Sequence, residues 1–95
     1  MKTILTCPKC EHDETTHGSV DVYQYDHNGT TGHHINAHGD EVRVNGDMTG
    51  NPNHGKNCVT FVVFCGKCKH ISMLTVSTKN SQTIISNETP PSLAI

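Results

Sequence analysis

Two pairs of cysteines carry the most readily interpreted chemistry of this 95-residue chain. Cys7 and Cys10 form one Cys-x-x-Cys pair, and Cys65 and Cys68 form the other. Two cysteines separated by two residues can both point into one turn, and four thiolates complete the tetrahedral shell that zinc prefers. The sequence therefore predicts one structural Zn²⁺ per chain, held by these four side chains.

Two other interpretations of the pairs fit the sequence less well. A Cys-x-x-Cys redox dithiol usually begins a helix within a βαβ unit, and the sequence shows no such unit. Disulfides are typical of secreted proteins, but the apolar part of the chain's start is only Ile4 and Leu5, against roughly 7–15 residues in a secretory signal. No apolar run approaches the ~20 residues of a membrane span. We therefore expect a cytoplasmic protein with reduced cysteines and no membrane association.

The fifth cysteine, Cys58, lies seven residues before Cys65, inside an apolar stretch. An unpaired cysteine in such a stretch usually behaves as a small buried hydrophobe. We therefore expect Cys58 to pack in the core rather than to act as a fifth ligand or a reactive thiol.

The long spacer between the two pairs requires strands that return the chain to its starting point. A compact finger separates its pairs by roughly 15–20 residues, and here the spacer runs from Glu11 to Phe64. Alternating apolar residues predict several short strands, and no stretch carries a helical period. The predicted strands are 1–6, 19–25, one returning strand through Ile35 and 41–45 that is interrupted near Gly39, 58–64, 71–78 and 82–85. The stretch 58–64 is apolar on both faces and should be the central strand.

These elements predict one mainly β domain over residues 1–86, with a small antiparallel sheet and two Cys-x-x-Cys knuckles. Residues 26–57 form a His- and Gly-rich insert, read as a long inserted β-hairpin and a loop, and residues 87–95 form a flexible tail. Only 33% of the chain is apolar and it contains no Trp. A core this thin needs a metal or covalent staple.

The insert holds five of the eight histidines, and these could serve metal binding or recognition. Neutral imidazole binds zinc, copper and nickel readily. However, His33 and His34 point to opposite faces of a strand, and no Asp or Glu ligand pattern accompanies them. We therefore expect a partner-binding surface, and the candidate side chains are His33, His34, His38, His54, Lys67 and Lys69.

With its two Cys-x-x-Cys pairs and β-rich surroundings, the chain resembles small zinc-ribbon proteins encoded by bacteriophages and prophages. The residues that carry the resemblance are Cys7-Pro8-x-Cys10, Thr16-His17-Gly18, Asp47-Met48-x-Gly50-Asn51-Pro52, Phe64-Cys65-x-x-Cys68, Leu74, Lys79 and Thr83. The chain departs from the pattern at Asn80-Ser81, where a glycine is common. The resemblance implies a zinc-ribbon fold and a phage context, hence the host's cytoplasm. It implies no activity, because a fold does not fix a function.

The leading functional hypothesis is a non-catalytic, zinc-stabilised module that binds a host protein. Four thiolates leave no open metal position for chemistry. Self-association also fits, because a domain this small need not cover Phe61, Val63 and Met73.

Two alternatives belong to other classes of function. A nucleic-acid-binding zinc ribbon is disfavoured by the net charge of −2. Its contacts would be Lys9, Arg43, Lys56, Lys67 and Lys69, with Tyr23 or Tyr25 stacking on bases. A metal-dependent hydrolase would use His33, His34, His38 or His54 with Asp40 or Asp47, in no recognisable catalytic spacing.

Overall fold

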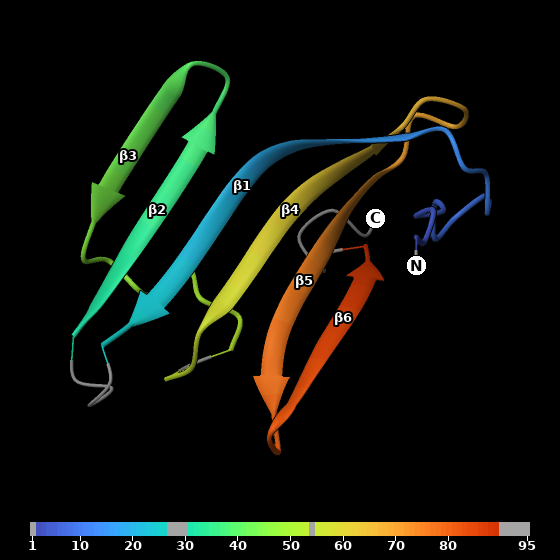
Figure 1. Cartoon of the computed structure of the whole chain (residues 1–95). Helices are drawn as coiled ribbons and strands as arrows, with labels where there is room; N and C mark the ends of the chain where they lie inside the picture. The colour runs from blue at the N-terminus through green and yellow to red at the C-terminus, as the bar shows by residue number, and fades with distance from the viewer. Residues whose placement is uncertain (1, 27–30, 54, 90–95) are drawn as a thin grey trace.

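Six antiparallel strands form one open sheet in the computed structural model, which describes residues 2–26, 31–53 and 55–89 (Figure 1). The strands are β1 (Thr15–Tyr25), β2 (Gly32–His38), β3 (Glu41–Asn45), β4 (Cys58–Cys65), β5 (Ile71–Lys79) and β6 (Gln82–Glu88). Their order across the sheet is β3-β2-β1-β4-β5-β6. These described residues contain no helix, so none that could cross a membrane. The predicted mainly β class is confirmed.

The first four strands are connected as a Greek key. Strands β1, β2 and β3 follow one another as neighbours, and β4 returns to lie beside β1. The connection through residues 46–57, here called the crossover loop, must therefore pass over β2 and β1. Strand β4 lies between β1 and β5, which confirms its predicted central place.

The predicted returning strand through Ile35 and 41–45 is wrong in one respect, because it is two strands. His38 pairs with Glu41, so Gly39 and Asp40 form the two-residue turn of a β-hairpin. Gly39 has a φ of 61°, which a two-residue hairpin turn requires at its first central position and which glycine adopts at no steric cost. The glycine read as an interruption is thus the turn itself.

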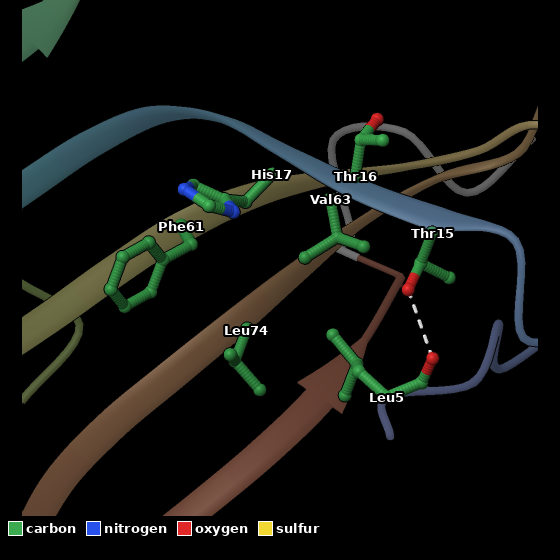
Figure 2. Close-up of a pocket in the computed structure, with 7 residues that line it drawn as sticks. All are labelled: Leu5, Thr15, Thr16, His17, Phe61, Val63 and Leu74. Atoms are coloured by element: carbon green, nitrogen blue, oxygen red, sulfur yellow. Dashed lines mark hydrogen bonds between the residues drawn. The ribbon is translucent and has the colours of Figure 1, made fainter. Parts of the chain in front are cut away.

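The ends of the described chain also differ from the prediction. Residues 2–6 form no strand. Instead Leu5 lies against Phe61, Val63 and Leu74 on one face of the sheet, and Thr15 Oγ1 donates a hydrogen bond of 2.9 Å to the Leu5 carbonyl (Figure 2). Lying over this face leaves the Leu5 side chain half-buried.

The observed bounds of two strands, β1 and β6, are wider than the predicted ones. Strand β1 begins four residues before the predicted Ser19, and β6 continues to Glu88. Residues 87 and 88 of the predicted tail therefore belong to a strand, and 90–95 lie outside the described residues. The predicted reversal around Asn28-Gly29 lies outside them as well.

The two faces of the sheet have different chemistry. Because paired residues of antiparallel strands share a face, the register assigns every strand residue to one side. One side, here called the aliphatic face, carries Val20, Val22, Ile35, Ala37, Val42, Val44, Val59, Phe61, Val63, Leu74, Val76 and Ile85. The opposite side, here called the polar face, carries Asp21, Tyr23, Tyr25, His34, Asn36, Arg43, Cys58, Thr60 and Thr75 together with the apolar Val62, Phe64, Ile71, Met73 and Ile84, and the crossover loop lies over it.

The fully buried side chains gather in two places. Val63, Cys65, Cys7 and Ser72 lie at the knuckle end of β4 and β5, and Tyr23, Cys58, Thr60 and Asn51 lie near the crossover loop. No single continuous core spans the sheet, which agrees with the predicted need for a staple.

The β5–β6 hairpin offers a stabilising substitution. Lys79 pairs with Gln82, and both residues of the turn have positive φ, 52° for Asn80 and 63° for Ser81. This is the type I′ turn, which strongly prefers Asn-Gly, because a side chain in the left-handed region costs roughly 1–2 kcal/mol. Ser81→Gly should raise the free energy of unfolding by about 0.5–1 kcal/mol, measured by urea unfolding with zinc present. Ser77→Gly within β5 is the control and should lower it; equal effects at the two positions would contradict the turn assignment.

Candidate metal centre

The sulfur atoms of the four predicted ligands meet at one point. All four lie within 4.8 Å of one another. Cys7 Sγ lies 3.6 Å from Cys68 Sγ, and Cys10 Sγ lies 3.6 Å from Cys65 Sγ. In a regular tetrahedron with Zn–S bonds of about 2.3 Å, the sulfurs are about 3.8 Å apart. The cluster therefore has the dimensions of a four-thiolate metal site.

Two turns of the same construction present these sulfurs. In the first turn, the Cys7 N–H donates to the His12 carbonyl and the Glu11 N–H donates to the Cys7 carbonyl, both at 2.9 Å. In the second, the Cys65 N–H donates to the His70 carbonyl and the Lys69 N–H donates to the Cys65 carbonyl, both at 3.0 Å.

The residue after each pair has positive φ, 63° at Glu11 and 65° at Lys69. A conformation that costs free energy is held in both turns, and their sulfurs point to one place. Two turns of the same geometry, with their sulfurs directed at one point, are what a metal ion bound by both Cys-x-x-Cys pairs requires.

The pairing of β1 with β4 brings the two turns together. Thr15 is opposite Cys65 at the end of that ladder, and the Gly66 N–H donates a 2.8 Å bond to the Glu14 carbonyl. Residues 50 and 52 positions apart in the sequence thus become neighbours, as the long spacer predicted.

Backbone N–H groups at the turns favour charged sulfur. The Cys68 N–H lies 3.5 Å from Cys65 Sγ and, as the largest influence there, lowers the pKa of Cys65 to about 6. At Cys7, desolvation raises the pKa, but the N–H groups of Cys10 and Lys9 outweigh it and the pKa is lowered. Both turns therefore prepare a thiolate, which is the form that binds metal.

Without a cation, the cluster does not carry four negative charges. At Cys10 the N–H of His12 lowers the pKa, but desolvation and the three neighbouring sulfurs prevail and raise it to about 12. Like charges this close disfavour one another unless a positive ion lies between them. The donor set thus fits a divalent metal ion.

Cys58 lies apart from this cluster. It is 2% exposed, pairs with Tyr23 in the ladder, and is not among the four cysteines whose sulfurs meet. Burial raises the pKa of its thiol. The prediction of a small buried residue is confirmed.

The described candidate histidines of the insert, His33, His34 and His38, are not gathered into a site. His33 and His34 point to opposite faces of β2, as predicted, and His33 is exposed. His34 stacks on Tyr23 with ring centroids 4.5 Å apart, and its Nε2 lies 2.7 Å from Asp21 Oδ1. Such a ring is held in place by its own sheet and is poorly placed to meet a partner.

Asp21, His38 and Asp47 also form hydrogen bonds within the chain. The Asn36 amide donates a 2.9 Å bond to the same Asp21 oxygen, and His38 Nδ1 is hydrogen-bonded to Ser19 Oγ. Asp47 accepts hydrogen bonds from Thr49, which lower its pKa. Across residues 2–26, 31–53 and 55–89 the four cysteines are the one cluster of three or more metal-ligating side chains. His54 lies outside these ranges.

The sequence prediction missed the structural role of the crossover loop. Asn51 is 1% exposed; its amide donates a 2.9 Å bond to the Lys56 carbonyl, and its Oδ1 accepts a 2.9 Å bond from the Asn53 N–H. A Cβ at Gly50 would lie 2.8 Å from the Tyr23 hydroxyl, so that position excludes larger residues. The Gly50-Asn51-Pro52 triplet was the available signal, but it predicts only a turn.

A further group of side chains, here called the knuckle patch, surrounds the second turn. It consists of Phe64 and Ile71, which pair across β4 and β5, and of Lys9, Lys67 and Lys69. Phe64 is 40% exposed and Ile71 42%. Lys69 Nζ lies 5.8 Å from the centre of the Phe64 ring, and a hollow of about 260 Å³ lined by Lys9, Lys69 and Ile71 lies beside Cys68. Apolar side chains with a basic rim thus lie directly on the metal-binding turns.

No protein-family description matches this chain, and no curated protein or solved structure is significantly similar to it. The assignment of the site therefore depends on its own geometry.

Proposed function

We propose that the chain is a non-catalytic binding module in which one Zn²⁺, held by Cys7, Cys10, Cys65 and Cys68, fixes the fold. The observation that carries the proposal is the four-sulfur cluster with tetrahedral dimensions. A zinc ion with four thiolate ligands has no position left for a substrate or an activated water. Its role is then to hold the two turns and the strands that continue from them.

The partner surface in this proposal is the knuckle patch. Exposed Phe64 and Ile71 provide apolar anchors, and Lys9, Lys67 and Lys69 surround them with positive charge. Such a surface favours a protein segment with apolar residues flanked by Asp or Glu, because the apolar contacts supply affinity and the charges supply orientation and association rate. Binding here costs little ordering free energy, because the metal would already hold the turns rigid.

The resemblance to phage zinc ribbons makes a host protein the proposed class of partner. Among the histidines predicted for recognition, His33 keeps an exposed side chain, whereas His34 is held between Tyr23 and Asp21. The proposal therefore moves the main contact from the insert to Lys67, Lys69 and their apolar neighbours.

Nucleic-acid binding is the second candidate, supported by the three lysines of the patch. The other predicted contacts do not join them. Tyr23 is 5% exposed, and the Tyr25 hydroxyl accepts hydrogen bonds from Asn51 and Gly55. Arg43 lies on edge strand β3, three strands from β4, beside Glu41. Base stacking and phosphate contacts would thus lack a common surface.

Capture experiments with the full, zinc-loaded chain test the proposal. Bacterial lysate should yield a protein partner that resists nuclease treatment. Replacing both Phe64 and Ile71 by Ser should weaken that binding at least tenfold, or about 1.4 kcal/mol. His33→Ala is the control and should leave it unchanged. Zinc content, expected at one per chain, verifies that each variant is folded.

The other outcomes would each support a different function. Captured nucleic acid whose affinity falls steeply with salt would establish the second candidate. A second bound metal together with hydrolytic activity lost in His33→Ala would establish an enzyme. Retention of the protein partner by the Phe64/Ile71 variant and its loss in His33→Ala would return recognition to the insert.

A further inference from the structure

The aliphatic face of the sheet has no second layer in the described structure. A sheet with one apolar face normally buries that face against helices or another sheet. Here the described residues that cross it are those of the N-terminal segment, where Leu5 lies over Phe61, Val63 and Leu74 at the knuckle end (Figure 2). The crossover loop lies on the opposite face. Within the described residues, most of the aliphatic face is therefore left without a covering layer.

Exposure on this face is largest at its two edges. Val42 and Val44 of β3 are 68% and 61% exposed, and Ile85 of β6 is 67% exposed. The strands between them contribute half-buried Val20, Val22, Val59 and Val76. The apolar surface thus runs across all six strands.

No Asp, Glu, Lys or Arg side chain interrupts the aliphatic face within the described strands, and the polar residues of that face lie toward the ends of the strands: His17, Gln24, His33, Ser72, Thr78, Thr83 and Asn87. The register places the charged residues of the strands, Asp21, Glu41, Arg43, Lys79 and Glu88, on the polar face. A surface without charge cannot select a partner by charge complementarity. The surface that fits it is another uncharged apolar face.

The chain as a whole exposes more surface than a compact monomer of its mass. The chain exposes 6934 Å², whereas a folded monomer of its 10.4 kDa mass exposes about 5,400 Å². The radius of gyration is 14.2 Å, against about 12 Å for a compact chain of this length. This excess of about 1,500 Å², summed over the whole chain, is larger than the ~800 Å² that each partner contributes to a standard stable interface, so an open sheet of this kind leaves room for one.

We infer that two copies of this chain form a homodimer by packing their aliphatic faces together. The dimer is a two-layer β-sandwich, with sheets about 10 Å apart and strands crossing at about 30°. Val44 and Ile85 lie in the interface, whereas Phe64 and Ile71, the apolar residues of the knuckle patch, lie on the outer, polar face of each copy. The inference does not depend on the proposed partner, since the two surfaces are on opposite sides of the sheet.

The test is the mass of the full, zinc-loaded chain in solution, measured by light scattering and sedimentation from about 1 to 100 μM. The expected mass is twice 10.4 kDa. Val44→Lys with Ile85→Lys should weaken dimerisation at least 100-fold, because each side chain would bury a charge in the sandwich. Ile84→Lys is the matched control: Ile84 is the neighbour of Ile85, it lies on the polar face and is 38% exposed, and its variant should remain dimeric.

Zinc content and amide dispersion by NMR verify that each variant is folded, and Val42→Lys alone replaces the double variant if that one does not fold. A wild-type chain that stays monomeric at 100 μM overturns the inference. The inference is also overturned if Ile84→Lys dissociates the dimer and the double variant, Val44→Lys with Ile85→Lys, leaves it intact. If deletion of residues 90–95 converts a monomer into a dimer, the chain's own terminus and not a second copy covers the face in the intact protein.

Discussion

Replacing Cys65 by serine should give a chain that neither binds zinc nor folds. The described residues form a single-layer sheet whose fully buried side chains gather in two small groups, so little apolar packing is available to replace a metal ion. Zinc binding in small metal-stabilised domains contributes about 10 kcal/mol or more, comparable with the whole 5–15 kcal/mol stability of a typical domain. Losing one of four ligands should remove most of that contribution.

The measurement is zinc content together with the dispersion of amide signals in the NMR spectrum. Chelation of zinc from the wild-type chain should produce the same collapsed spectrum as Cys65→Ser. Cys58→Ala is the matched control, since Cys58 is equally buried but lies outside the cluster; it should keep one zinc per chain. A Cys65→Ser chain with native-like dispersion would refute the coupling of metal and fold.

Acid should produce the same unfolding without a mutation. The pKa of Cys65 in the folded chain, about 6, lies below the ordinary value of 9.0. A group with a lowered folded pKa contributes stability that is fully present above its unfolded pKa and is lost as the pH falls through the folded pKa. Protons also compete with zinc for the same sulfur. The stability contributed by this thiolate should therefore decline as the pH falls from 9 toward 6, and zinc occupancy should be lost below about pH 6.

The metal centre could be predicted from the sequence because its chemistry is local. Two residues between paired cysteines fix where each pair of sulfurs can point, and four sulfurs identify the coordination shell. The apolar stretch 58–64, predicted to be central, and the stretch 71–78 identified two neighbouring strands for the same reason, since a run with apolar residues on both faces is a pattern of near neighbours. The burial of Cys58 could be predicted from its place in the first of these stretches.

The remaining features depend on long-range pairing, which short-range patterns do not determine. Gly39 interrupts a strand pattern in the sequence, and only pairing of His38 with Glu41 makes it a turn. Leu5 continues an apolar start, and only the position of β4 and β5 decides that it covers a face. His34 looked free for recognition until the register placed it beside Tyr23 and Asp21.

Asn51→Ala should destabilise the fold by about 2–4 kcal/mol while leaving the metal centre intact. The Asn51 side chain is almost completely buried, and it binds both the Lys56 carbonyl and the Asn53 N–H. Alanine would leave these two backbone groups without their partner, and each buried unsatisfied group costs about 1–3 kcal/mol. The Tyr25 hydroxyl, 3.4 Å from the Asn51 amide, would lose a further contact.

The position of Asn51 separates this effect from loss of zinc. The crossover loop joins β4 at Cys58, whereas the metal ligand Cys65 lies at the other end of the same strand (Figure 1). Urea unfolding of the zinc-loaded chain measures the loss of stability, and a chromophoric chelator measures the zinc, expected at one per chain as in the wild type. Asn53→Ala is the matched control: its amide makes one exposed 3.1 Å bond to the Thr78 carbonyl, so its loss should cost less than about 1 kcal/mol. If the Asn51→Ala chain is as stable as the Asn53→Ala chain, the crossover loop is held by its backbone and not by the Asn51 side chain. If the Asn51→Ala chain loses zinc, the two ends of β4 do not fold independently of each other.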